Sequence, residues 1–166
     1  LGEFDRVLEA AVHALAGSLA LLQNDSVTAR TSFQRAAELD RSSVDALAGL
    51  VALDFKANNA AAAKSRIEER LRTDSTPAML LLAAQTFWTA QDLVSAERVL
   101  RQAIEKAPTL LTSYGMLAQL YVSQKKLDQA RVEFENLAAK QSQPVGALTM
   151  SGIILQAQGK NDLAKK

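Results

Sequence analysis

The sequence has no cysteine, only one histidine, and almost no net charge over its 166 residues. The absence of cysteine excludes disulfide bonds, zinc–thiolate sites and thiol nucleophiles. The 19 Lys and Arg residues nearly cancel the 18 Asp and Glu residues, so no bulk charge attracts nucleic acid or an anionic membrane. No apolar run approaches the ~18–20 residues that a membrane-spanning helix needs. The composition therefore argues against redox, nucleic-acid and membrane-spanning functions.

Residues that could carry out catalysis are equally scarce. His13 is the only histidine, and it has neither a second histidine nor a cysteine as a partner. We therefore expect it to be packed or partly exposed rather than catalytic or metal-binding. The pair Gly159-Lys160 lacks the Ser or Thr that follows the lysine of a phosphate-binding loop. The sequence predicts no catalytic residue, no cofactor, no metal and hence no enzyme.

An alanine recurs at a constant spacing along the chain. The positions are Ala29, Ala63, Ala96, Ala130 and Ala164, with separations of 34, 33, 34 and 34 residues. Each alanine follows a short polar break: Asn24-Asp25, Asn58-Asn59, Gln91-Asp92, Lys125-Lys126 and Gly159-Lys160. Between breaks the apolar residues recur every three or four positions, which is the helical period. The repeating element is therefore predicted to be helix, turn, helix, turn, about 34 residues long.

Within this period, residues 111–144 show the fullest set of large apolar, small and aromatic positions. That set is Tyr114, Leu117, Ala118, Tyr121, Ala130 and Phe134. The pattern resembles the tetratricopeptide repeat, in a loosely matched, bacterial-type array. The resemblance implies an all-α fold, a right-handed superhelical solenoid of stacked antiparallel helix pairs. Small residues in such a fold let neighbouring helix backbones approach closely.

The resemblance extends over nearly the whole chain and divides it into repeats. We expect a single array over residues 1–166, with residues 1–9 as an N-terminal extension of the first helix. The repeats are predicted at 10–43, 44–76, 77–110 and 111–144, with a partial repeat at 145–166. The chain starts at Leu1 without a methionine and stops inside a predicted helix, so we expect a fragment of a longer protein.

Repeat 44–76 departs from the pattern. It is one residue short, and it has Arg70 where alanine is usual and Asp54 where a large apolar residue is expected. We expect a small rotation of the helix that lets Leu53 and Phe55 fill the space and turns Asp54 outward. The alternative is a buried carboxylate paired with a nearby arginine, which would need compensation for its lost hydration.

In the family that the sequence resembles, five positions of each first helix face a concave groove. Here those positions are apolar or carry amides and hydroxyls, with Asp45 and Lys56 as the only charges. A clamp of basic side chains for a partner's carboxylates is therefore not expected. The alternative for Trp88 and Phe55 is packing against the neighbouring repeat only. The predicted peptide-groove residues are Leu22, Phe55, Leu81, Gln85, Trp88, Gln119, Val122, Ile153 and Gln156.

These features favour a non-catalytic scaffold for protein–protein interaction within a multiprotein assembly. Its groove would bind an apolar or amphipathic peptide or helix of a protein partner. We expect no nucleic-acid partner and no direct membrane insertion by this fragment. One alternative is a spacer or self-association module that uses its apolar end faces, and another is the repeat region of a larger enzyme or envelope-assembly protein. By resemblance alone, the periplasmic side of a bacterial cell envelope is favoured, with the cytoplasm as the alternative.

Overall fold

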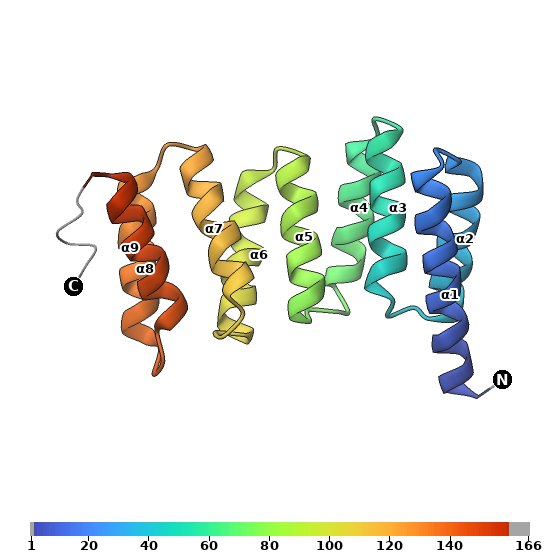
Figure 1. Cartoon of the computed structure of the whole chain (residues 1–166), viewed down its shortest axis with the longest axis horizontal. Helices are drawn as coiled ribbons and strands as arrows, with labels where there is room; N and C mark the ends of the chain where they lie inside the picture. Colours follow the sequence, from blue (N-terminus) through green and yellow to red (C-terminus); the bar gives the residue numbers. More distant parts are fainter. Residues whose placement is uncertain (1, 160–166) are drawn as a thin grey trace. The chain divides into compact units, whose positions relative to one another are not determined.

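The computed structural model describes residues 2–159, and every regular element in that range is an α-helix (Figure 1). The all-α prediction is confirmed. The helices are α1 (Glu3–Leu22), α2 (Ser26–Leu39), α3 (Val44–Lys56), α4 (Ala60–Leu71), α5 (Pro77–Thr89), α6 (Leu93–Lys106), α7 (Leu111–Ser123), α8 (Leu127–Lys140) and α9 (Val145–Ala157).

The chain forms two compact units, an N-terminal unit (Leu1–Thr86) and a C-terminal unit (Phe87–Lys166). In the N-terminal unit α1 packs on α2 and α3, α2 packs on α3, and α3 packs on α4. In the C-terminal unit α7 contacts α6, α8 and α9, and α8 packs on α9. Each unit therefore repeats the same arrangement, in which a helix packs on its successor and on the next helix but one. This is the packing of a helical-repeat solenoid.

The turn that joins the two helices of each pair is built from backbone hydrogen bonds. The Asp25 amide donates to the Ala20 carbonyl at 2.9 Å, and the Asn24 amide donates to the Leu21 carbonyl at 3.0 Å. This pair of hydrogen bonds is the Schellman motif, which requires a residue of positive φ just after the helix. The predicted polar breaks supply that residue each time, at Asn24, Asn58, Gln91, Lys125 and Gly159, with φ between 56° and 74°.

Small residues allow the close helix packing that the repeat requires. The recurring alanines Ala29, Ala63, Ala96 and Ala130 are fully buried, and Ala164 lies outside the described residues. The ring of Phe33 lies between two glycines. A Cβ on Gly17 would come within 2.8 Å of that ring, and one on Gly49 within 2.3 Å. The predicted role of small residues is confirmed, and Gly49 extends it to a position that the pattern did not single out.

The expectation that Asp54 turns outward is wrong. Asp54 is buried, and its two carboxylate oxygens are held by arginines from the helices on either side. Arg30 of α2 lies 3.3 Å from one oxygen, and Arg66 of α4 lies 3.0 Å from the other. Because these guanidinium groups replace water as donors, the carboxylate can stay buried. The alternative interpretation, a buried carboxylate paired with arginine, is confirmed.

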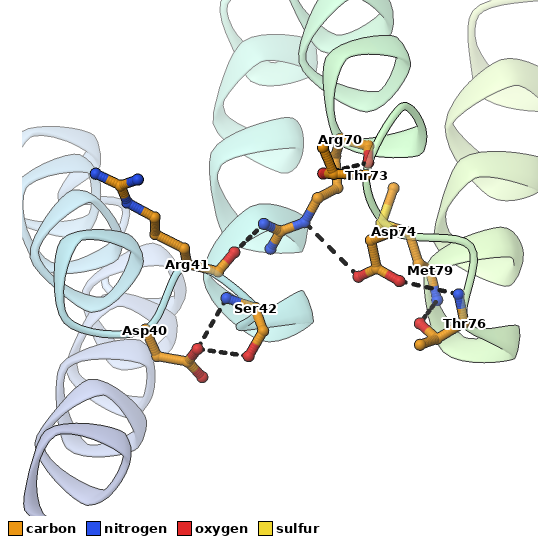
Figure 2. Close-up of polar contacts among 8 residues, drawn as sticks. All are labelled: Asp40, Arg41, Ser42, Arg70, Thr73, Asp74, Thr76 and Met79. Atoms are coloured by element: carbon orange, nitrogen blue, oxygen red, sulfur yellow. Dashed lines mark hydrogen bonds and ion pairs between the residues drawn. The ribbon is translucent and has the colours of Figure 1, made fainter. Parts of the chain in front are cut away.

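Arg70, the second irregular residue of this repeat, joins two turns (Figure 2). Its guanidinium donates to the backbone carbonyl of Arg41 in the turn between α2 and α3. Its Nε lies 3.8 Å from the Asp74 carboxylate, in the turn between α4 and α5. Asp74 in turn accepts from the Thr76 amide at 2.9 Å. An arginine therefore replaces the usual alanine here because it reaches past the helix surface to fix the flanking turns.

Candidate protein-binding surface

From α5 onward, the first and second helices of the pairs differ in the chemistry of their exposed sides. Helices α5, α7 and α9 contain no Asp, Glu, Lys or Arg, whereas α2, α4, α6 and α8 each carry charges of both signs. Apolar side chains nevertheless remain exposed on the uncharged helices. Val122 is 50% exposed, Leu148 57% and Ile153 47%. An uncharged, partly apolar surface that the fold leaves open is the usual character of a protein-binding surface.

The N-terminal unit carries four of the nine predicted groove residues. Leu22, at the end of α1, is 83% exposed. Gln85 of α5 is exposed, and Phe55 of α3 and Leu81 of α5 are partly buried. These four side chains therefore combine apolar surface that packing leaves uncovered with one amide group.

The C-terminal unit carries the other five. Trp88, near the end of α5, is partly buried. Gln119 and Val122 are exposed on α7, and Ile153 and Gln156 are exposed on α9. Gln119 and Ile153 are 34 residues apart, and so are Val122 and Gln156. Because α7 contacts α9, the two residues of each pair occupy equivalent positions on neighbouring first helices. None of the nine predicted residues is buried, and their role as a groove stays a prediction.

The structure also shows a polar network in the C-terminal unit that sequence reasoning missed. The Tyr121 hydroxyl donates to Glu97 at 2.8 Å and accepts from Arg101 at 3.0 Å. Arg101 also donates to Glu133 at 2.7 Å. Burial raises the pKa of the Tyr121 phenol, and the hydrogen bond to Glu97 raises it further. This network joins α6, α7 and α8 through side chains that the repeat pattern had marked only as polar or aromatic.

Two pockets lie beside second helices, away from the predicted groove residues. One of about 410 Å³ lies between α2 and α4, over Leu47 and Leu50, and its rim includes three arginines: Arg41, Arg66 and Arg70. The other, of about 530 Å³, lies between α6 and α8 and is lined by Arg101, Ile104, Glu105, Pro108, Glu133, Leu137, Lys140 and Gln141. The two pockets occupy corresponding places in the repeat, because several lining positions differ by 67 residues.

The described residues show no further chemical centre. Within 2–159 no group of three His, Cys, Asp or Glu side chains is placed to hold a metal ion. His13 is partly exposed, and its Nε2 lies 3.9 Å from a carboxylate oxygen of Glu9. Of the helices in this range, none is long and apolar enough to cross a membrane.

Comparison with known proteins agrees with this architecture. Residues 87–150 match the family model of the tetratricopeptide repeat. No curated protein sequence matches the chain. Among solved structures, PilF of Pseudomonas aeruginosa is 21% identical, with a TM-score of 0.67 over 97% of this chain and 74% of that one.

Two further solved structures are similar. A MamA protein is 16% identical, with a TM-score of 0.59 over 94% of this chain and 86% of that one. YrrB, described as a tetratricopeptide repeat protein with an unusual peptide-binding site, is 17% identical, with a TM-score of 0.54 over 89% and 77%. Likeness at these identities shows the shared fold.

Proposed function

Because the chain carries tetratricopeptide repeats, which in general are non-catalytic interaction modules, we propose that it is a scaffold for protein–protein interaction. Its ligand is an apolar or amphipathic segment of a partner protein, bound mainly on the exposed sides of α5, α7 and α9. The observation that carries the proposal is the uncharged character of α5, α7 and α9, beside second helices that are all charged.

The predicted groove residues divide into anchors and hydrogen-bonding groups. Leu81, Trp88 and Val122 offer apolar surface to a partner side chain, and aromatic anchors of this kind carry much of an interface's binding energy. The amides of Gln119 and Gln156 can each donate to and accept from the backbone of a bound segment. An acidic peptide is disfavoured, because α5, α7 and α9 contain no Lys or Arg to neutralise it. The partly buried Trp88 is the central anchor in this proposal.

A scaffold of this kind acts by holding other proteins together, so we place it in a multiprotein assembly. Its exposed faces supply binding surface rather than reactive groups. If the natural protein also contains a catalytic domain, the same surface would serve to recruit that domain's substrates or partners.

Trp88 is the only tryptophan, so its fluorescence reports on its own surroundings. Peptides selected on the chain from a displayed random library are titrated against it. We expect the selected peptides to be apolar or amphipathic and to shift the Trp88 emission to shorter wavelength. By calorimetry, Trp88→Glu should weaken binding at least tenfold, because a carboxylate replaces an apolar anchor.

The matched control is Val94→Glu, which places the same charge on an 80% exposed valine of the second helix α6. It should leave the affinity unchanged. The proposal is overturned if the selected peptides are acidic, or if Val94→Glu and Trp88→Glu weaken binding equally. Failure to select any peptide that binds at micromolar concentration would also overturn it.

A further inference from the structure

The first helix carries an apolar stripe that nothing within the described chain covers. Its members are Phe4, Val7, Leu8, Val12, Leu15, Leu19 and Leu22, which are 48–83% exposed. Apart from the adjacent Val7 and Leu8, they are spaced three or four residues apart, which places them along one broad side of α1. The opposite side of α1 is buried by α2 and α3 through the small residues Ala10, Ala14, Gly17 and Ala20. α1 is thus apolar on both sides, and only one side is packed.

The stripe is large for a monomer surface. If each half-exposed side chain offers about 100 Å², roughly half of what a large side chain can bury, the stripe offers about 700 Å². The largest apolar patch on an ordinary monomer covers about 300–600 Å². A stable interface buries about 800 Å² on each partner. The stripe and the residues along its edges are therefore large enough for a specific interface.

We propose that this stripe binds the same stripe of a second copy of the chain, with the two α1 helices antiparallel. The charges around the stripe select that orientation. The start of α1 carries Glu3, Asp5 and Glu9 against the single cation Arg6, whereas residues 10–22 contain no Asp, Glu, Lys or Arg. Beside the other end of α1 lies Lys56, whose Nζ donates to Asn24 at 3.2 Å.

Antiparallel packing brings the acidic start of each α1 towards Lys56 of the other copy. Parallel packing would instead bring Glu3 and Asp5 of both copies together and align the two helix dipoles unfavourably. When the stripe is reversed about residue 13, Phe4 faces Leu22 and Val7 faces Leu19, while Leu8 and Leu15 meet the smaller Ser18 and Ala11. Such a two-fold interface uses the same surface on both copies and therefore closes at a dimer.

The first test measures mass against concentration by light scattering and sedimentation. We expect a reversible dimer of the chain, and at least a tenfold weaker dissociation constant for Leu15→Glu, whose side chain is 71% exposed in the stripe. Val94→Glu, with comparable exposure outside the N-terminal unit, is the control and should dimerise normally. A strict monomer at high concentration, or a dimer that Leu15→Glu leaves intact, overturns the proposal.

The orientation can be tested because the chain contains no cysteine. Val12→Cys, close to the two-fold axis, should form a disulfide-linked dimer under mild oxidation. Phe4→Cys should not link to itself but should link to Leu22→Cys when the two variants are mixed. Self-linking of Phe4→Cys would indicate parallel helices and would overturn the antiparallel arrangement.

The charge argument has a separate test. Lys56→Glu should weaken the dimer several-fold, and adding Glu3→Lys and Asp5→Lys should restore it. Trp88→Glu should leave the dimer unchanged, so failure of the dimer and failure of the peptide-binding proposal are distinguishable. If the stripe instead binds neutral phosphatidylcholine vesicles while the chain stays monomeric, a lipid surface is the occupant and the dimer proposal is overturned.

Discussion

Each unit contains a buried side-chain cluster at the same place in the repeat, and the two clusters carry opposite net charges. Asp54 in the N-terminal unit and Tyr121 in the C-terminal unit are 67 residues apart, two repeats along, and both are buried. Their neighbours are related by the same offset. Asp54 is held between Arg30 and Arg66, whereas the equivalent positions beside Tyr121 are Glu97 and Glu133. The repeat sets which side chains meet, and the central residue decides which charge its neighbours carry.

The difference follows from which hydrogen bonds each central side chain can donate or accept. A buried carboxylate can only accept, so Asp54 needs donors, and the two guanidinium groups supply them. A neutral phenol can donate, so Tyr121 can sit beside Glu97. Two glutamates then need a cation, and Arg101 pairs with both at 2.8 and 2.7 Å. Two arginines with one aspartate leave +1, and two glutamates with one arginine leave −1. The sign of the cluster is therefore exchangeable, provided that all its members change together.

The largest effect is expected when only part of this exchange is made. In the double variant Arg30→Glu with Arg66→Glu, the buried Asp54 loses both cations and meets two further carboxylates. Removing the partners of a buried charge costs about 3–5 kcal/mol. Urea unfolding at pH 7, followed by helical circular dichroism, should show a loss of this size in the N-terminal unit.

The control completes the exchange. Adding Asp54→Tyr and Gln34→Arg to that double variant copies the C-terminal cluster into the N-terminal unit and should recover most of the lost stability. A double variant less than about 1 kcal/mol below the parent chain would show that the cluster is not a coupled unit.

One glycine in each unit offers a second comparison, in which the expected change in stability is smaller. Gly49→Ala would place a Cβ 2.3 Å from the Phe33 ring, which is already confined on its other side by Gly17. Overpacking of this kind costs about 1–3 kcal/mol. Gly115→Ala in α7 meets nothing within 4 Å and should stabilise its helix by about 0.5–1 kcal/mol. Opposite shifts of the denaturation midpoint are expected, and shifts of the same sign would contradict the packing described for Phe33.

Tyr121→Phe removes the hydroxyl that joins Glu97 to Arg101 and should cost about 1–2 kcal/mol at pH 7. The pKa of this phenol is raised in the folded state, so the folded chain holds its proton more tightly than the unfolded chain. The resulting stabilisation is full below the ordinary tyrosine pKa of about 10 and is lost as the pH rises above it. The stability gap between parent and variant should therefore narrow between pH 9 and pH 11. A constant gap would contradict the assigned hydrogen bonds.

The smallest effect concerns helix starts. Asn59 caps α4 by accepting from the Ala62 amide at 3.0 Å, whereas α8 starts after Lys126, which makes no side-chain cap. Lys126→Asp should supply the missing acceptor and a favourable charge at the helix N-terminus, and should stabilise the C-terminal unit by about 0.5–1 kcal/mol. Thermal unfolding would check this, and an unchanged or lower midpoint would contradict it.

The sequence predicts the periodic part of the structure well, because its cause lies within each repeat. The buried alanines and the polar turns come from local sterics and backbone geometry, which every repeat must satisfy. The Asp54 cluster escaped prediction because Arg30 and Arg66 lie on two different helices, 24 and 12 residues away. Comparing each repeat with a family pattern treats Asp54 as an isolated exception. Comparing repeats two apart would have revealed the matched exchange of charges.

The candidate surface was predictable only in part, for a related reason. Helical period and resemblance indicate which side of a first helix faces away from its neighbours, and all nine predicted side chains are at least partly exposed. The side of α3 that meets Phe33 could not be read in the same way, because α3 is apolar around most of its circumference. The α1 stripe has the same ambiguity, since a pattern of apolar residues does not say which side finds a partner.

The turns at Asn24, Asn58, Gln91 and Lys125 have a consequence for how such a chain can be assembled and changed. Since each turn is closed by main-chain amides and carbonyls, it requires almost nothing of the particular helices that it joins. A duplicated or transplanted segment that begins and ends at such turns brings its own connectors with it. Recombination can therefore lengthen, shorten or reorder the chain while leaving the junctions chemically identical. The constraint on which segments can be neighbours then comes from the clusters around Asp54 and Tyr121. Each of these residues needs side chains of a particular charge on the helices before and after it.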